Sequence, residues 1–321
     1  MFTDIGLIGR YMSWYIQRSG GEVNGGHVRF LQFALTLLHP QTGYLTQKPE
    51  LRFTLTDAVS EEQWAARCSA AFSKLAGQVK ALERVEKKSR DPNGPVAAVL
   101  QLENPMLALQ DMVHRLRSSR PTAGTHTEAL WGRDVLLIGL MMCSPLRAKN
   151  LRHLTYREDG KGNLRRKPDG TWELFIPKGH FKNRDGAASK REYRIVLDAS
   201  IYRDLEVYLG VFRPMLLKGN SKATDYLFVS TTGGTNNQPW KSLNRHVQTL
   251  TAQHLMQCPG AGPQVIRHIV ATSIVKATGE YSTAALVLHD EEETVRKAYA
   301  HLCIEDGHTK FRKLFPEIFK E

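Results

Sequence analysis

The longest regular pattern in the sequence predicts one continuous amphipathic helix over residues 60–85. Ser60 and Gln63 have the spacing of a capping box, in which each side chain hydrogen-bonds the backbone of the other at a helix start. Apolar residues then recur at intervals of three and four, which is the period of one helix face. The stripe consists of Trp64, Cys68, Phe72, Leu75, Val79, Leu82 and Val85. This part of the chain is therefore predicted to be helical.

Shorter helical patterns flank this segment, at residues 4–18, 27–38 and 104–116. A segment rich in Pro, Gly and small polar residues follows at 118–125, and this composition is typical of an exposed linker. A chain of 321 residues also exceeds the usual size of one domain, about 100 to 200 residues. The sequence therefore predicts an all-helical first domain at 1–118, a linker at 119–126 and a second domain at 127–321.

The second domain has a mixed pattern. A buried helix is expected up to Cys143, and strand-like runs follow at Trp172 to Ile176 and Tyr193 to Leu197, separated by a polar, basic loop. Further helices are predicted near 199–212, 240–255 and 263–277. The predicted fold class is mainly α with a small antiparallel β-sheet, in which an all-helical N-terminal domain is joined to an α+β domain.

The charge of the chain favours a polyanionic partner. Lys and Arg number 44 against 32 Asp and Glu, which gives a formal net charge of +12. Such an excess promotes binding to nucleic acid through the release of condensed counterions. The longest apolar run, residues 135–144, is far shorter than the ~20 residues of a membrane span, and no secretory signal is visible at the N-terminus. A cytoplasmic, DNA-associated protein with no membrane partner is expected.

The cysteines predict neither a disulfide framework nor a metal site. The four cysteines are scattered without a CxxC pair, so free thiols are the simplest expectation. The close pairs His254 with Cys258 and His301 with Cys303 are weak candidates for zinc. No metal and no cofactor are predicted.

Three segments carry candidate chemistry, and each has an ordinary structural alternative. Arg147 follows the turn Ser144-Pro145-Leu146, where it could offer a planar fork of donors to a phosphate or simply be solvated. Gln264, Arg267 and His268 share one face of a predicted helix, which could equally be an exposed polar stripe.

The third segment runs from Leu286 to Leu302. Asp290 and Glu293 have the spacing of a capping box, which places His289 at the entrance of a helix. Tyr299 then lies on the same face as Val295, where a buried core tyrosine is the alternative to a nucleophile.

Taken together, these segments resemble the tyrosine recombinase, or phage integrase, family over residues 127–302. The shared order is an anchored Arg, a basic hairpin, a Gln-x-x-Arg-His helix and a His ten residues before a Tyr. The resemblance implies that Arg147 and Arg267 bind the phosphate, that His289 is the late histidine and that Tyr299 is the nucleophile. It also implies that the first domain is a core-binding domain that clamps DNA.

The chain departs from the family pattern at three points. Asn150 stands where the family usually has an acid, Gln264 replaces a His, and the interval from His289 to Tyr299 is one residue longer than the common spacing. The family's catalytic lysine lies in a hairpin between two strands. Lys182 is the preferred match here, with Lys178 as the alternative.

The resemblance implies a site-specific recombinase or integrase of a mobile element that cleaves and rejoins DNA through a covalent 3'-phosphotyrosine intermediate without a metal. Its partners would be double-stranded DNA recombination sites, bound by a homo-tetramer on two sites, with accessory DNA-bending proteins as further candidates. The amphipathic C-terminal segment around Phe311 to Phe319 would either pack on its own domain or dock on a neighbouring protomer. DNA relaxation by a type IB topoisomerase and a catalytically silent DNA-binding protein of the same fold are the alternatives.

Overall fold

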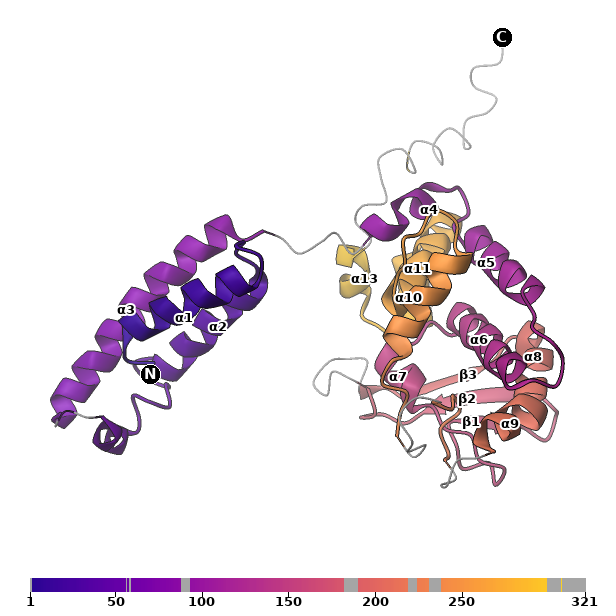
Figure 1. The fold of residues 1–321 in the computed structure, drawn as a ribbon, viewed down its shortest axis with the longest axis horizontal. Helices are drawn as coiled ribbons and strands as arrows, with labels where there is room; N and C mark the ends of the chain where they lie inside the picture. The colour runs from indigo at the N-terminus through magenta and orange to yellow at the C-terminus, as the bar shows by residue number, and fades with distance from the viewer. Residues whose placement is uncertain are drawn as a thin grey trace, which may run out of the picture. The chain divides into compact units, whose positions relative to one another are not determined.

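The computed structural model describes residues 2–55, 57, 59–87, 93–181, 190–218, 224–230, 238–298 and 307. The chain divides into two compact units, residues 1–91 and 92–321 (Figure 1). Each unit has its own apolar core. The described part of the chain is mainly helical with one small antiparallel sheet, which confirms the predicted fold class.

The first unit is helical. It contains α1 (Ile5–Arg18), α2 (Gly25–Leu38), the 3-10 turn η1 (Pro49–Thr54) and α3 (Glu61–Val85). The predicted capping box at the start of α3 is present, since Ser60 accepts from the backbone of Gln63 and the Gln63 side chain accepts from the backbone of Ser60. The predicted stripe then buries Trp64, Cys68, Leu75 and Val79 against α1 and α2. Burial of this stripe is what gives the unit its core.

The second unit begins with short helices and continues as a helical layer around α6. Its first elements are η2 (Gly94–Val96), α4 (Ala97–Gln101), α5 (Met106–Ser118), α6 (His126–Cys143) and α7 (Ala148–His153). After the sheet come η4 (Ala199–Ile201), α8 (Tyr202–Val207), the π-turn η5 (Tyr208–Phe212) and α9 (Arg213–Leu217). The last helices are α10 (Leu243–His254), α11 (Pro263–Thr278), α12 (Tyr281–Leu288) and α13 (Glu292–Ala298).

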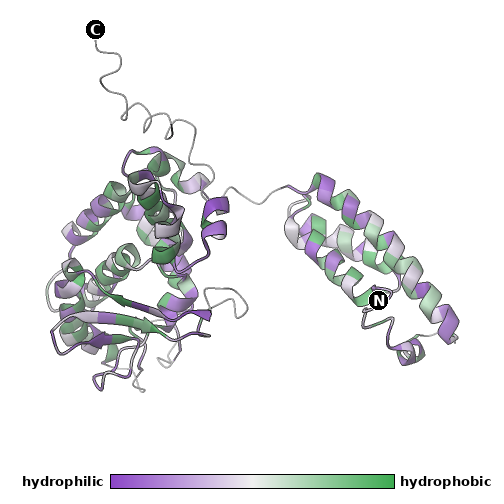
Figure 2. Ribbon diagram, turned by 180° about the vertical axis from the view of Figure 1, so that it is seen from behind, coloured by the Kyte–Doolittle hydropathy of each residue, from purple (hydrophilic) through white to green (hydrophobic). Residues whose placement is uncertain are grey.

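Helix α6 lies at the centre of this unit. It packs against α5, α8, η5, α9 and α11, and most of its residues are buried. Helices of both units carry apolar and polar residues in alternation (Figure 2), but α6 is apolar over nearly its whole last half. A helix that is apolar on several sides is stable only inside a core, so α6 fixes the turn that follows it.

The sheet has the order β1-β2-β3, with β1 (Leu164–Arg166), β2 (Trp172–Ile176) and β3 (Tyr193–Val196) all antiparallel. The sequence predicted β2 and β3, and the structure adds β1. Ile176 pairs with Tyr193, so the chain between these strands leaves and re-enters the sheet at one end. Trp172, Leu174 and Ile176 on the central strand join the core of the unit.

The division between the units differs from the predicted linker at 119–126. Helix α5 belongs to the second unit, because Leu109, Met112 and Leu116 are buried in the same core as α6. The segment predicted as a linker is a short connection between α5 and α6 that is held by hydrogen bonds to Glu128. Arg120 and the backbone N–H of Gly124 both donate to the buried Glu128 carboxylate, at distances of 2.5 to 2.7 Å. Pro, Gly and small polar residues here form a helix-to-helix connection and its cap.

The division between the units falls instead at the sequence Asp91-Pro92-Asn93-Gly94-Pro95, whose prolines and glycine disfavour a continuous helix. Within the described residues no helix combines the length and the apolar character that a bilayer crossing needs.

Candidate active site

Arg147 lies where α6 ends and α7 begins. Its backbone is extended, and its carbonyl accepts from the backbone N–H groups of Asn150 and Leu151, at 2.8 and 3.1 Å. The preceding turn is closed by hydrogen bonds from Ser144 to Leu140 and from Leu146 to Ser144. Because α6 is buried and the turn is closed, the backbone of Arg147 is held in place, as the sequence predicted. Its side chain is 32% exposed.

Arg267 lies in the second turn of α11 and is almost completely buried. One of its nitrogens, Nη1, donates to the carbonyl oxygens of Pro145 and Leu288, the latter at 3.2 Å. Pro145 belongs to the turn before Arg147, and Leu288 is the last residue of α12. Arg267 thus connects three segments of the unit, and this binding fixes its guanidinium group beside Arg147.

The two arginines meet at one oxygen atom. Nη2 of Arg147 and Nη2 of Arg267 both donate to Oδ2 of Asp290, at 2.7 and 3.3 Å. A third arginine, Arg191, donates from Nη2 to the backbone carbonyl of Asp290 at 3.3 Å. Two guanidinium groups therefore bind the carboxylate of Asp290 and a third binds its backbone carbonyl, so the cluster keeps an excess of positive charge.

The capping box predicted from Asp290 and Glu293 is wrong. Helix α13 begins at Glu292, and Glu293 pairs instead with Lys297 at 2.6 Å. Oδ1 of Asp290 accepts from the backbone N–H of Glu291 at 3.2 Å, while Oδ2 is bound by the arginines. The spacing of Asp290 and Glu293 favoured a helix cap. Arg147 and Arg267, however, bind the Asp290 carboxylate more strongly than a backbone amide does, because their guanidinium groups are charged.

His289 lies beside this cluster in a left-handed backbone conformation, with φ of 50°, at the end of α12. Its ring packs on Phe181 and against the edge of Tyr193, with centroid distances of 4.4 and 5.2 Å. The predicted late histidine is therefore next to the arginine cluster, on the segment that also carries Asp290. Phe181 and Tyr193 come from the two ends of the hairpin, so the hairpin base supports the histidine.

Tyr193 is a neutral phenol at this site. Burial raises the pKa of its hydroxyl, whereas the hydrogen bond with Ser144 and the positive charge of Arg267 act in the opposite direction. The distance between the hydroxyl oxygens of Tyr193 and Ser144 is 2.9 Å. A buried hydroxyl with a raised pKa and a fixed partner is a poor nucleophile, and the contact that Tyr193 makes in the site is the one between its ring and that of His289.

Among the residues that the structure describes, neither Gln264 nor Lys178 contacts this cluster through a hydrogen bond or ion pair. Gln264 lies in the first turn of α11, exposed, one turn before Arg267. Lys178 is exposed in the turn after β2. Lys182 and Tyr299 lie outside the described residues. Asn150, which stands where the resembling family usually has an acid, is buried, and its Nδ2 donates to the carbonyl of His180 at 3.4 Å.

Sequence reasoning missed Asp290, Arg191 and Tyr193 as members of the site. The position of Asp290 directly after His289 was the available signal, but its spacing to Glu293 pointed to a helix cap instead. Arg191 was noted only as part of a basic loop. No periodicity or motif in the sequence indicates that Asp290 and Arg191 belong to the same site as Arg147.

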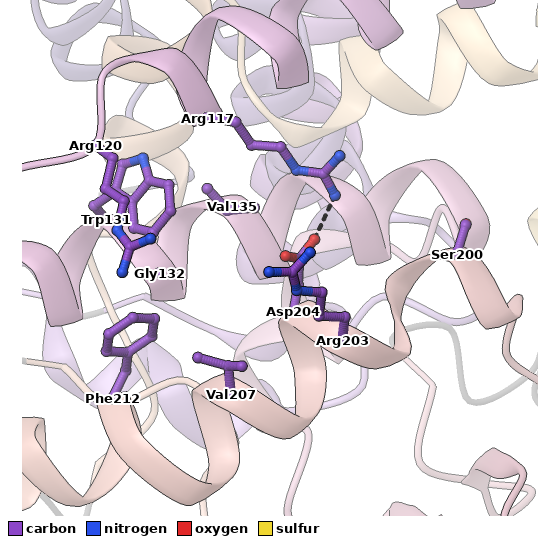
Figure 3. A pocket seen from close by; sticks show the side chains of 10 residues that line it. All are labelled: Arg117, Arg120, Trp131, Gly132, Val135, Ser200, Arg203, Asp204, Val207 and Phe212. Carbon is purple, nitrogen blue, oxygen red and sulfur yellow. Dashed lines mark hydrogen bonds and ion pairs between the residues drawn. The ribbon is translucent and has the colours of Figure 1, made fainter.

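A hollow of about 530 Å³ lies along the N-terminal half of α6, and none of the arginines that bind Asp290 lines it (Figure 3). Arg117 pairs there with Asp204 at 2.5 Å, and Arg120, which pairs with Glu128, lies over the ring of Trp131 at 5.4 Å. Asp204, which lines this hollow, and Glu128 are thus each paired with a different arginine. At Asp290, by contrast, two arginines share a single oxygen.

The thiol of Cys143, the last residue of α6, should react slowly. Burial raises its pKa to about 11, and the negative charge of Asp198 acts in the same direction. At pH 8 the thiolate fraction is then about one in a thousand, and only the thiolate attacks an alkylating reagent. Peptide-resolved mass spectrometry of iodoacetamide labelling should show the Cys143 rate rising about tenfold for each pH unit between 7 and 10. Equal rates at pH 8 in the folded and the urea-unfolded protein would contradict this.

Comparison with known proteins found similarity to solved structures. No protein-family model matches the sequence, and no curated protein matches it. The chain is similar to two crystal structures of the XerH site-specific recombinase, one bound to palindromic difH substrate after cleavage and one bound to difH substrate before cleavage. Their sequence identities are 15% and 16%, and their TM-scores are 0.48 and 0.46. The alignments cover 83% and 82% of this chain and 71% and 68% of the XerH chains.

The third structure is a crystal structure of the XerA recombinase. It is 14% identical to this chain, covers 98% of it and 99% of its own length, and has a TM-score of 0.43. With every TM-score below 0.5, these similarities do not decide the function of this chain.

Proposed function

We propose that this protein is a tyrosine-type site-specific DNA recombinase, which cleaves and rejoins DNA through a covalent 3'-phosphotyrosine intermediate. The observation that carries the proposal is the convergence of Arg147 and Arg267 on one anionic oxygen. The two residues are far apart in the sequence, and both match the arginines that the resemblance assigns to phosphate binding. The net charge of +12 supports a nucleic-acid partner.

The chemistry needs the residue types found in the cluster. When an oxygen nucleophile attacks a phosphodiester, the five-coordinate phosphorus carries extra negative charge on its non-bridging oxygens. Fixed guanidinium donors stabilise that charge more than they stabilise the ground state, so they lower the barrier. Arg147 and Arg267 would fill this role, and His289 would add a hydrogen-bond donor beside them.

Tyr299 would be the nucleophile and Lys182 the general acid. The bond from the Tyr299 oxygen to phosphorus forms as the bond from phosphorus to the 5' oxygen breaks. A phenol has an unperturbed pKa of about 10, and surrounding positive charge favours its loss of a proton. Lys182 would protonate the departing 5' oxygen. Attack of that or another 5' hydroxyl on the phosphotyrosine reverses the step and rejoins the strand.

The other parts of the proposal concern assembly on DNA. Lys74, Lys80 and Arg84 are exposed on α3, opposite its buried stripe, and would contact the phosphate backbone as part of a DNA-clamping first unit. A homo-tetramer on two recombination sites, accessory DNA-bending proteins and an origin in a mobile element remain predictions. The C-terminal segment around Phe311 to Phe319, expected either to pack on its own domain or to dock on a neighbouring protomer, lies outside the described residues.

A denaturing gel tests the function directly. The protein is incubated in EDTA with nicked duplexes taken from the flanks of its own gene, because a nick beside the cleaved bond traps the covalent intermediate. A protein–DNA adduct that forms with the wild type and not with Tyr299→Phe is the expected result. Salt-sensitive DNA binding without any adduct would refute strand cleavage and favour the silent DNA-binding protein.

A further inference from the structure

The side chain of Asp290 occupies the point at which the two phosphate-binding arginines converge. Its Oδ2 atom lies 2.7 Å from Nη2 of Arg147 and 3.3 Å from Nη2 of Arg267. The Asp290 side chain is 13% exposed and that of Arg267 is 3% exposed, so water screens these contacts only weakly. One oxygen that accepts from two guanidinium groups has the position that a phosphate oxygen needs at the same site.

The arginines do not depend equally on this carboxylate. Arg267 is also bound by the carbonyl oxygens of Pro145 and Leu288, so its guanidinium group stays in place without Asp290. For Arg147, Asp290 is the one side chain that the structure pairs with it within the described residues. Removal of the carboxylate would therefore leave one fixed donor and one donor that is free to bind another anion.

The backbone of Asp290 is fixed while its carboxylate can turn. Its N–H donates to the carbonyl of Ala285 at 2.9 Å, and its carbonyl accepts from Arg191. Within the described part of the chain, its side chain is bound through Oδ1 and Oδ2, so a rotation about χ1 is the movement that would release the arginines while the backbone stays in place. A carboxylate on a fixed backbone can thus leave the site and return to it.

We propose that Asp290 is an internal competitor of the phosphate, a carboxylate that fills the anion position between Arg147 and Arg267 until a phosphodiester displaces it. The inference deepens the proposed function, since it assumes that this cluster binds the reacting phosphate. A free anion must separate two charge-assisted contacts to enter. A DNA phosphate has further contacts along the duplex, and their binding energy supports the displacement. Asp290 would therefore discriminate against isolated phosphate and in favour of phosphate presented by DNA.

Binding of inorganic phosphate to the full chain tests the proposal without DNA. Asp290→Asn keeps the shape of the side chain and removes its charge, and it should bind orthophosphate at least about tenfold more tightly than the wild type in isothermal titration calorimetry. The matched control is Glu293→Gln. It changes the net charge equally on the same segment, but Glu293 is exposed and pairs with Lys297, so its phosphate affinity should stay within about twofold of the wild type.

A second substitution tests whether the gain in phosphate affinity depends on the arginines. In Asp290→Asn, the added change Arg147→Ala should remove the gain in phosphate affinity. Thermal melts show that each variant is folded, and Asp290→Ser provides a smaller neutral side chain for the same comparison. An unchanged or weaker phosphate affinity in both neutral variants would overturn the proposal, because it would mean that Asp290 only positions the arginines. A gain that persists with Arg147→Ala would overturn it as well.

The test of this proposal can fail independently of the test of the proposed function. The adduct assay with Tyr299→Phe reports strand cleavage, whereas the phosphate titration reports competition at the arginine cluster. A gain in phosphate affinity without any adduct would keep the internal competitor and reject the recombinase. An adduct without a gain in phosphate affinity would support the recombinase and reject Asp290 as an internal competitor.

Discussion

Replacing Arg267 with Lys should lower the rate of covalent adduct formation about 100- to 1000-fold, which is the typical loss when one fixed donor to a transition-state oxyanion is removed. Lysine keeps the charge but has no planar fork of donors. In the structure the guanidinium group binds Pro145, Leu288 and Asp290 at once, and an ammonium group at that depth cannot reproduce the same set of contacts. The rate should be measured at saturating DNA, so that weaker binding does not contribute to the loss.

Arg296→Lys is the matched control for this substitution. Arg296 is exposed on α13 and pairs with Glu292 at 2.7 Å, outside the cluster. Its replacement should leave the adduct rate within about threefold of the wild type, since exposed pairs contribute little. The buried carbonyls left by Arg267→Lys should also lower the free energy of unfolding, by about 1 to 3 kcal/mol for each group left without a donor. A folded Arg267→Lys protein with a near-normal adduct rate would exclude Arg267 from transition-state binding.

Replacing Gly132 with Ala should destabilise the second unit, although alanine is the better helix former. Gly132 lies inside α6, and a Cβ atom there would be 3.0 Å from Cγ of Phe212 and closer still to Cδ2 and Cε2. Phe212 is buried, packs edge-on against Trp131 at a centroid distance of 6.3 Å and lines the same hollow as Gly132 (Figure 3), so the new methyl group would force its ring out of this packed position. Overpacking of this kind costs about 1 to 3 kcal/mol, which for a unit of this size lowers the melting temperature by roughly 2 to 4 °C for each kcal/mol.

Gly139→Ala on the same helix is the control. A Cβ at position 139 would be 3.5 Å from Ile201, which is ordinary contact, so alanine should raise stability there by roughly 0.5 to 1 kcal/mol. In Gly132→Ala, the further change Phe212→Leu should restore part of the lost stability, because the smaller side chain makes room for the new methyl group. If Gly132→Ala melts at or above the wild-type temperature, the close packing of α6 on Phe212 is refuted.

Much of the local structure could be predicted from the sequence because its causes lie within a few residues. The capping box at Ser60 and the apolar stripe of α3 are settled by side chains three and four positions apart. Strand β2 was predicted with its observed bounds, Trp172 to Ile176, from a short apolar, strand-like run. The turn that holds Arg147 follows from a buried helix that meets a proline.

The prediction from the sequence was wrong where the same local pattern is compatible with two structures. Pro, Gly and small polar residues at 118–125 are typical of a linker, yet they also suit a tight connection whose polar groups bind one buried carboxylate, Glu128. The spacing of Asp290 and Glu293 suits a helix cap, yet Asp290 binds two arginines. In both cases the deciding interaction depends on which elements pack together.

By itself, the sequence determined the helical first unit, the mixed second unit, the basic charge and the order of the candidate residues along the chain. Only the tertiary structure decided that Arg147 and Arg267 meet at Asp290. The physical reason is distance along the chain: helix periods and caps are local, whereas Arg147 and Asp290 are separated by 143 residues and become neighbours only when α11 packs against both α6 and α12.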